Sequence, residues 1–287
     1  IVSYDAMETI RNTNEWMGAS ARAIASYPIF ALNPHPIFKL MSAWGRVTER
    51  SYARMVIKPD WEIPPIAGDQ GQDHIVYVEP VMKRPFGDLI HFRVARRAAQ
   101  PRKVLLIAPM SGHYATLMRS TVTSLLPDCE VYVTDWHNAR DIPVSEGKFD
   151  IEDYTQYLVD FMRHLGPDTN VIAVCQPTVP CLAASALMAE DGEAARPLSL
   201  TLMGGPIDVA AAPSSVVAYA ERHSTAWFEQ TLIGTVPWRW PGAGRRVLPH
   251  FVQLASFMMM QPERHLTQHI RLFEAMARGD VAEASRI

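Results

Sequence analysis

Four largely apolar stretches recur along the middle of the chain, each five or six residues long. They span residues 103–108, 130–135, 170–174 and 198–203 and are rich in Val, Leu and Ile. Apolar runs of this length are typical of strands that are buried on both faces of a sheet. Because helical patterns separate the four stretches, their order predicts a mostly parallel sheet with helical crossovers, an α/β fold.

Two strand-like segments precede these four. Residues 74–80 and 88–94 have strand composition, and the turn residues Arg84-Pro85-Phe86-Gly87 between them predict a hairpin. An antiparallel hairpin followed by four parallel strands is the order of the first six strands in the α/β-hydrolase fold. We therefore predict that residues 69–210 form an α/β-hydrolase core.

The segment before this core has a helical pattern. Apolar residues recur at helical spacing from Tyr4 to about Tyr52, with a break at Pro28 and a second helix expected from about Pro36. Residues 1–68 are thus predicted to be an N-terminal helical extension that ends in a Pro-rich linker. Such apolar stripes most often pack in a core, and contact with a partner surface is the alternative.

The last segment, residues 211–287, differs in composition. It carries many Trp, Phe and Met residues, which prolines and a glycine interrupt. In α/β-hydrolases this position commonly holds a lid, so we predict a helical lid here. Its aromatic and Met residues are expected in a core, and an adaptable surface for an apolar polymer is the alternative.

Composition and charge exclude several classes of protein. A net charge of -3, a pI near 6.4 and the lack of a dense Lys/Arg block argue against binding of nucleic acid. The three cysteines, Cys129, Cys175 and Cys181, lack the spacing of a disulfide framework, which favours a reducing compartment and hence the cytoplasm. No apolar run is long enough for a transmembrane segment, and the chain begins with no signal-peptide pattern.

The candidate chemistry lies directly after the third buried strand. Cys175 follows that strand and precedes an Ala-rich helical pattern, which places it on a sharp strand-to-helix turn. In α/β-hydrolases this turn holds the nucleophile, and it needs compatible residues two positions to either side, here Ala173 and Pro177. The positive end of the following helix favours a thiolate at such a position. A small core cysteine is the alternative.

The segment from Asn170 to Met188, with its Val-Cys-Gln-Pro, Val-Pro and Ala-rich helix, resembles the lipase-box-like region of the intracellular polyhydroxyalkanoate depolymerases. The similarity extends from about Tyr4 to the C-terminus. It implies a Cys-His-Asp mechanism on stored poly-3-hydroxybutyrate at the surface of cytoplasmic granules, with Cys175 as the nucleophile. It implies no cofactor, apart from coenzyme A as an optional acyl acceptor.

Acyl transfer through Cys175 needs donors for the oxyanion of the tetrahedral intermediate. The backbone N–H of Gln176 is one expected donor, and the loop after the first buried strand supplies the second from Met110 or Ser111. The same loop carries His113 and Tyr114. We expect these two residues to contact substrate, with His113 as the general base a less favoured alternative.

Asp135 and Trp136 follow the second buried strand, at the carboxyl edge where open α/β sheets bind ligands. Two interpretations of these residues have equal weight: contact with substrate, or a solvated loop in which the Trp is packed. His265 and His269 share a helix face but lack a third ligand, so no metal site is predicted. Gly204-Gly205 does not match a phosphate-binding loop, and the sequence contains no serine elbow.

The acid and the base of the implied triad are not evident in the sequence. In the family they follow strands seven and eight, and no convincing strand follows residue 203. We expect the catalytic Asp and His beyond residue 287, in a longer enzyme with the missing C-terminal strands; recruitment of Asp208 and an internal His is the alternative. The sheet would then end in an unpaired edge, which favours self-association into a homo-oligomer.

Two other functions compete with the depolymerase. A polyhydroxyalkanoate synthase-like acyltransferase also uses a Cys on such a turn, but its pattern has Gly two residues later, where this chain has Pro177. A non-catalytic granule-binding protein would use the N-terminal helices and the lid region for apolar contact. The polymer or its granule is the predicted partner in each case.

Overall fold

The structure is a computed structural model, and it describes residues 4–32, 35–53, 57–67, 72–95, 101–110, 114–211, 215–249, 252–253, 262–280 and 283–284. The chain divides into two compact units. The helical unit comprises Ile1–Lys58, Thr225–Gly234 and Leu248–Ile287, and the sheet unit comprises Pro59–Ser224 and Thr235–Val247. These units differ from the three consecutive segments expected from the sequence, because the N-terminal helices group with the C-terminal part of the chain.

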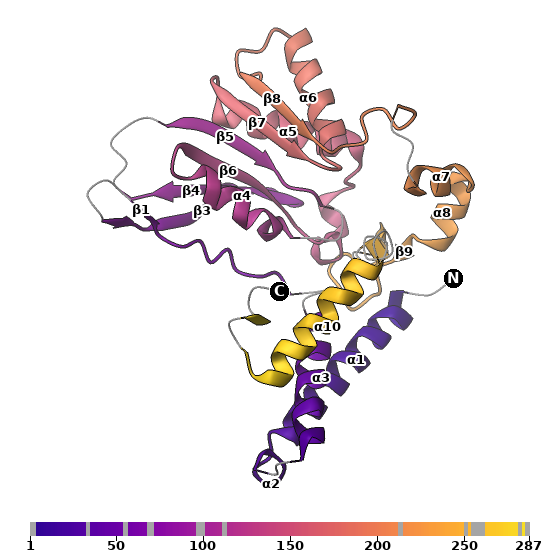
Figure 1. Cartoon of the computed structure of the whole chain (residues 1–287). Helices are drawn as coiled ribbons and strands as arrows, with labels where there is room; N and C mark the ends of the chain where they lie inside the picture. Colours follow the sequence, from indigo (N-terminus) through magenta and orange to yellow (C-terminus); the bar gives the residue numbers. More distant parts are fainter. Residues whose placement is uncertain are drawn as a thin grey trace. The chain divides into compact units, whose positions relative to one another are not determined.

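The sheet unit is built on a six-stranded sheet in the order β3-β4-β6-β5-β7-β8 (Figure 1). β3 and β4 form an antiparallel hairpin, β4 is antiparallel to β6, and the remaining neighbours are parallel. This is the order of the first six strands of an α/β-hydrolase, so the predicted fold class and all six predicted strands are confirmed. The strands are β3 (Val76–Met82), β4 (Gly87–Val94), β5 (Arg102–Ile107), β6 (Cys129–Trp136), β7 (Thr169–Val174) and β8 (Ser199–Met203).

Helices pack on both faces of this sheet. Leu105 and Ile107 of β5 point into a core with α5 (Ile151–Leu165) and α6 (Thr178–Glu190). Leu106 and Ala108 point to the other face, where η2 (Ala115–Met118) and α4 (Arg119–Leu125) cover them. The alternation follows from the two-residue period of a strand. Both faces of β5 are covered, which explains why its apolar run is continuous rather than alternating.

The edge strand β8 is much more exposed than β5. Leu198, just before β8, is 65% exposed, and Met203 at its end is 51% exposed. The neighbouring helix α6 also leaves Val179, Leu182 and Leu187 exposed. Among the residues that the structure describes, β8 pairs only with β7, so the predicted open edge is present there.

Short elements complete the sheet unit. The Pro-rich segment after residue 57 leads into the small ladder of β1 (Ile66–Ala67) with β2 (Asp73–His74). The loop after β6 forms two 3-10 turns, and α7 follows β8. A second small ladder joins β9 and β10. These elements are η3 (Ala139–Asp141), η4 (Val144–Glu146), α7 (Ser215–Glu221), β9 (Gly234–Thr235) and β10 (Arg246–Val247).

The helical unit contains an antiparallel hairpin of α1 (Tyr4–Ala25) and α3 (Pro36–Ala53), joined through the single turn α2 (Pro28–Ala31). The two predicted N-terminal helices and the break at Pro28 are thus confirmed. The unit also holds α8 (Thr225–Thr231) and α10 (Pro262–Arg278), and α10 packs against α3. No helix in the described part of the chain is both long enough and apolar enough to cross a bilayer.

Two glycines bring α1 and α3 into backbone contact. A Cβ atom on Gly18 would lie 2.5 Å from the backbone N of Glu49, and one on Gly45 would lie 2.7 Å from the backbone N of Arg22. Real Cβ atoms do not approach this closely, so a larger residue at either site must push the helices apart. The hairpin therefore depends on glycine at both positions.

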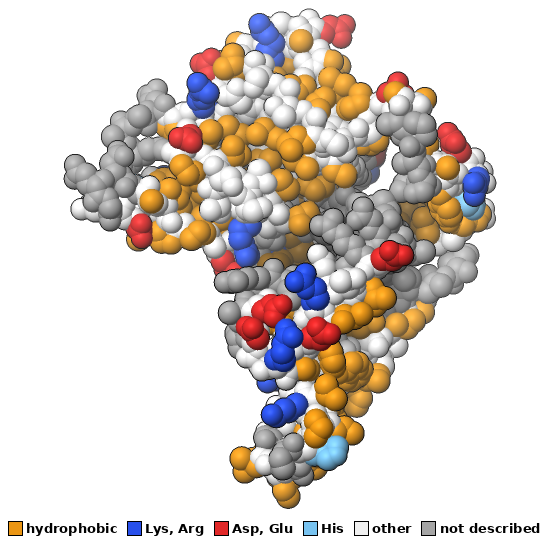
Figure 2. Space-filling model, viewed as in Figure 1, with side chains coloured by type: hydrophobic (Ala, Val, Ile, Leu, Met, Phe, Trp, Pro, Cys, Tyr) orange, Lys and Arg blue, Asp and Glu red, His pale blue; other side chains and the backbone are white. Residues whose placement is uncertain are grey.

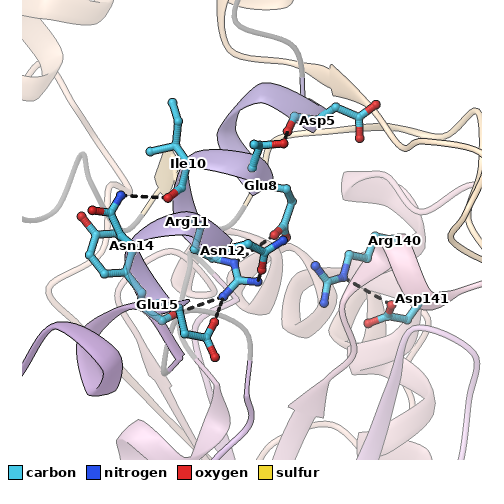
Figure 3. A network of polar contacts seen from close by, with 11 residues as sticks. Asp5, Glu8, Ile10, Arg11, Asn12, Asn14, Glu15, Arg140 and Asp141 are labelled. Carbon is cyan, nitrogen blue, oxygen red and sulfur yellow. Dashed lines mark hydrogen bonds and ion pairs between the residues drawn. The ribbon is translucent and has the colours of Figure 1, made fainter. Parts of the chain in front are cut away.

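A network of charged and polar side chains lies on α1 (Figure 3). The guanidinium of Arg11 donates to the Glu8 carboxylate at 2.9 Å and to the Glu15 carboxylate at 2.6 Å. It also donates to Asn12 and, at 3.2 Å, to the backbone O of Tyr52 on α3. Glu8 and Arg11 are both buried, so their ion pair offsets part of the cost of removing the two charges from water.

Candidate active site

Cys175 lies at the junction of β7 and α6, as the sequence predicts. Its φ angle is +67°, a left-handed conformation that a non-glycine residue rarely adopts. Its N–H donates to the O of Met203 at 2.8 Å, which extends the pairing of β7 with β8 by one residue. The backbone strain of this sharp turn places the thiol just past the carboxyl end of the sheet, where α/β-hydrolases hold a nucleophile.

Thr178 closes the turn from the helix side. Both its N–H and its hydroxyl donate to the O of Cys175, at 3.1 and 2.8 Å. Thr178 is fully buried, and Gly205, from the segment after β8, packs directly on it. A Cβ atom on Gly205 would lie 1.6 Å from the hydroxyl oxygen of Thr178. Gly205 therefore leaves room for Thr178, the residue that fixes the elbow, and this role has no counterpart in a phosphate-loop pattern.

Gln176 follows Cys175 at the start of α6. Among the described residues its backbone N–H has no hydrogen bond, and the side chain is exposed. Pro177, at the N-cap position, has φ −63° and ψ −11°, so the chain enters the helix without strain. A free N–H at the positive end of a 13-residue helix is a suitable donor to an oxyanion.

The loop that was predicted to supply the second donor is anchored at its first residue. The N–H of Ala108 donates to the Thr134 hydroxyl at 3.0 Å, and the indole N–H of Trp136 donates to the O of Ala108 at 2.9 Å. Ala108, Thr134 and Trp136 are all buried, so these bonds are shielded from water. Met110, two residues further on, packs against the core. The predicted Ser111 and His113 lie outside the described residues.

Tyr114 resumes the chain after this loop and is half-buried. Burial raises the pKa of its phenol; the nearby Arg140 acts to lower it and Asp141 to raise it. The phenol thus remains protonated at neutral pH and can donate a hydrogen bond. Arg140 is itself buried, with its guanidinium 3.9 Å from the centroid of the Trp240 ring. Substrate contact by Tyr114 stays a prediction.

Asp135, the last residue of the predicted strand 130–135, and Trp136, expected after it, are the last two residues of β6. Both are buried, and Asp135 pairs with Asp88 of β4 in the ladder. The indole of Trp136 packs edge-on against Tyr154, with 4.5 Å between the ring centroids. Trp136 therefore supports the end of β5 from within the core, and substrate contact by Asp135 or Trp136 stays a prediction.

The three cysteines have different surroundings. Cys175 is half-buried on the elbow, whereas Cys181 is fully buried in the core under α6. Burial raises the pKa of the Cys181 thiol to about 12, against a weaker lowering by its hydrogen bond with Ser185. Cys181 is consequently protonated and unreactive at neutral pH. Cys129 begins β6, away from the carboxyl edge of the sheet.

Within the described part of the chain, no acid and base are paired with Cys175. Among the described residues, no histidine ring forms a hydrogen bond with the thiol. The Asp208 carboxylate accepts from the N–H groups of Ala210 and Ala211, at 2.9 and 3.1 Å, and so closes a local turn. The described residues also hold no cluster of His, Cys, Asp or Glu that could bind a metal ion.

Part of the predicted lid belongs to the sheet unit. The guanidinium of Arg245 donates to the O atoms of Gly147 and Pro143, at 2.6 and 2.9 Å. The N–H of Gly242 donates to the O of Arg140 at 2.8 Å, where a Cβ atom would meet three backbone oxygens at 2.8–3.0 Å. Residues 235–247 are thus clamped onto the loop after β6. The three consecutive Met residues of the predicted lid, at 258–260, lie outside the described residues.

Part of the chain resembles a known protein family. Residues 204–287 match the family model described as "PHB de-polymerase C-terminus", a stretch that begins just beyond the elbow. No significant match to a curated protein was found.

Solved structures with a similar arrangement include ester hydrolases. An α/β-hydrolase enzyme from the metagenome of Lake Arreo, Spain, is 17% identical, covers 73% of this chain and 63% of its own, and has a TM-score of 0.37. Brefeldin A esterase, a bacterial homologue of human hormone sensitive lipase, is 12% identical over 80% and 62%, with a TM-score of 0.37. A second Lake Arreo ester-hydrolase is 17% identical over 74% and 64%, with a TM-score of 0.39. This chain therefore spans less than two thirds of their length.

The strand order, the left-handed elbow at Cys175 and the anchored loop after β5 define the class: the sheet unit has the α/β-hydrolase fold. The match over residues 204–287 agrees, for that part of the chain, with the resemblance to a poly-3-hydroxybutyrate depolymerase predicted from the sequence.

Proposed function

We propose that this protein is an ester hydrolase that cleaves poly-3-hydroxybutyrate, with Cys175 as its nucleophile. The observation that carries the proposal is the left-handed turn at Cys175 between β7 and α6. Strain of this kind persists only where the surrounding structure supports it, and here Thr178 and Gly205 do so. The match of residues 204–287 to a depolymerase model supports the choice of substrate.

The proposed reaction has two steps. A base removes the thiol proton, the Cys175 thiolate attacks the ester carbonyl carbon, and a C–S bond forms. The N–H of Gln176 and an N–H from Met110 or Ser111 would hold the oxyanion. The C–O bond then breaks, and the leaving alkoxide takes the proton from the base. Water, or the thiol of coenzyme A, cleaves the acyl-thioester and restores Cys175, releasing a 3-hydroxyacyl product.

The proposed base and acid are a His and an Asp beyond residue 287, consistent with the lack of a histidine bonded to the Cys175 thiol among the described residues. The proposed setting is the surface of polymer granules in the cytoplasm. The competing acyltransferase has Gly where this chain has Pro177, and no observation in the structure favours it.

The test is trapping of the acyl-thioester. The full-length protein would be mixed with amorphous poly-3-hydroxybutyrate, quenched in acid and digested, and the acylated peptide located by mass spectrometry. We expect a 3-hydroxyacyl adduct on Cys175 in the native full-length protein. The Cys175→Ala variant should lose adduct and 3-hydroxybutyrate release by about a thousandfold or more, as removal of a nucleophile does. The matched control, Cys129→Ala, should behave as the native chain.

Three results would contradict the proposal. Undiminished hydrolysis by Cys175→Ala would exclude Cys175 as the nucleophile. Polymer formation from 3-hydroxybutyryl-coenzyme A would identify an acyltransferase instead. Sedimentation with granules in the absence of both adduct and product would identify a binding protein.

A further inference from the structure

The outer end of the α1–α3 hairpin exposes large apolar side chains. We call this end, residues 24–32 and 35–40, the hairpin tip. Leu32 is 86% exposed, Ile29 69% and Tyr27 64%, and the flanking residues Ile24, Ile37 and Leu40 are exposed as well. Figure 2 shows hydrophobic side chains gathered around α2. Single exposed apolar residues are ordinary, but a cluster of this size marks an interaction surface.

The tip is an ordered element. The rings of Phe30 and Phe38 stack with 5.0 Å between their centroids and join α2 to α3. The N–H of Phe30 donates to the O of Tyr27 at 2.9 Å, and that of Leu32 donates to the O of Pro28 at 3.1 Å. Ile29 and Leu32 are therefore presented outward by a turn whose interior is already filled.

The charge pattern around the tip is one-sided. No Asp or Glu occurs between Glu15 and Glu49, although the chain carries 30 acidic residues. The same 33 positions hold Arg22, Lys39 and Arg46. Arg22 forms an ion pair with Glu49 at 2.6 Å. Lys39 and Arg46 have no hydrogen bond or ion pair with any residue that the structure describes. The tip is thus an apolar surface with an unopposed cationic border.

A pocket of about 480 Å³ opens beside the tip, entirely within the helical unit. Lys39, Ser42 and Arg46 recur every three or four residues on α3, so they share one face of the helix and line the pocket together. Phe30 and Phe38 line its apolar side. Arg278, at the end of α10, adds a third cation, which Glu283 pairs with at 2.8 Å.

We propose that the hairpin tip and this pocket form a binding site for anionic lipid at a water–apolar interface. The exposed aliphatic side chains of the tip enter the acyl layer, and Lys39 and Arg46 bind the phosphate of a headgroup in the pocket. Apolar burial combined with attraction between cations and anionic lipids is how an interfacial helix attaches to a membrane surface without spanning it. A tip-to-tip contact with a second copy is disfavoured, since it would bring the two cationic borders together.

This inference is independent of the proposed ester hydrolysis and is tested by flotation of the full chain with vesicles. We expect binding to vesicles of phosphatidylcholine with one quarter phosphatidylglycerol, and weak binding to phosphatidylcholine alone. The tip variant Ile29→Ser/Leu32→Ser should reduce the partition coefficient at least about tenfold, because two exposed apolar side chains no longer enter the lipid. The cation variant Lys39→Gln/Arg46→Gln should remove the preference for phosphatidylglycerol.

Matched controls are available in the sheet unit. Val144→Ser changes another exposed apolar residue, and Arg102→Gln another exposed cation; both should bind vesicles as the native chain does. Competition by inorganic phosphate at millimolar concentration would show a free-phosphate pocket instead of a lipid site. A native chain that ignores vesicles, a tip variant that binds them fully, or a dimer in solution that the tip variant converts to monomer would each overturn the proposal.

Discussion

Both compact units depend on close contacts at glycine, but glycine meets different atoms in each. In the helical unit, Gly18 and Gly45 face the backbone of the opposite helix. In the sheet unit, Gly205 faces the side chain of Thr178. A backbone atom in a helix cannot move without moving the helix, whereas a side chain can be replaced. The helical contact therefore requires glycine whatever side chains surround it. At the elbow, the size allowed at position 205 depends on the side chain at position 178.

The two units also differ in where they place their apolar residues. The sheet unit covers both faces of β5, whereas the hairpin is closed by backbone contact and leaves Ile29 and Leu32 outside. Close approach at glycine needs few large side chains between the helices. The large residues of the hairpin are then available for another surface, which the lipid site would use.

The largest expected effect is that of Gly18→Ala. On an open helix surface this change would stabilise by about 1 kcal/mol, through better helix propensity. Here the new Cβ atom would lie 2.5 Å from the Glu49 backbone N, so we expect a net loss of at least about 3 kcal/mol, at the upper end of overpacking effects. Urea denaturation followed by circular dichroism measures the free energy of unfolding.

Two controls make that prediction sharper. Thr13→Ala, at an exposed position of the same helix, should change stability by less than about 0.5 kcal/mol. Adding Glu49→Ala to Gly18→Ala should give no rescue, because the obstructing atom belongs to the backbone. Recovery of stability in that double variant would show that the Glu49 side chain, rather than its backbone, limits the size of residue 18.

The second prediction concerns the buried charges of the helical unit. Arg11→Leu removes a cationic partner of the buried Glu8 carboxylate, and we expect a loss of about 3–5 kcal/mol. The matched control is Arg22→Leu, whose ion pair with Glu49 is 45% and 30% exposed and should contribute less than about 1 kcal/mol. Equal losses in the two variants, measured by denaturation, would mean that Glu8 is solvated.

The third prediction applies to the elbow. Gly205→Ala should cost about 2–3 kcal/mol and slow acylation of Cys175, because Thr178 must shift away from the O of Cys175. Thr178→Gly on its own removes a hydrogen bond and should be milder for stability. In the double variant the clash is absent, so part of the lost stability should return. A double variant as unstable as Gly205→Ala would refute the pairing of these two residues.

The sequence was a good guide to the elements and to Cys175. The six strands were predictable because buried strands have an apolar pattern that does not depend on distant residues, and the elbow because strand, Cys and helix are adjacent in sequence. The role of Gly205 was not, since Thr178 lies 27 positions earlier and only the pairing of β7 with β8 brings the two together. Phosphate-loop patterns test local spacing and cannot detect such a contact.

The grouping of elements into units was also beyond the sequence pattern. Residues 235–247 have the composition of the lid around them, yet they belong to the sheet unit through Arg245 and Gly242, which bind backbone oxygens of the loop after β6. Every residue carries a backbone oxygen, so the sequence does not indicate which of these oxygens a given donor will bind. The position of Trp136 within β6 was missed for a related reason, because pairing with Gly87 of β4 continues the strand one residue past its predicted end at Asp135.

The smallest expected effect is a pH dependence confined to the sheet unit, and its source is Cys181. The ordinary pKa of a cysteine is 9.0, and burial raises that of Cys181 to about 12 in the folded protein. Between these values the unfolded chain has lost the proton that the folded chain keeps. The stability contribution is therefore complete below pH 9 and is lost as pH rises toward 12, by at most about 1.4 kcal/mol per pH unit.

Denaturation from pH 8 to 10 should show this decline in the native chain and in Cys129→Ala, and a shallower one in Cys181→Ala. The same slope in all three would assign the effect to other groups, such as the buried phenol of Tyr154, whose pKa burial also raises. The helical unit contains no cysteine in its described residues, so its helical signal should not follow this titration.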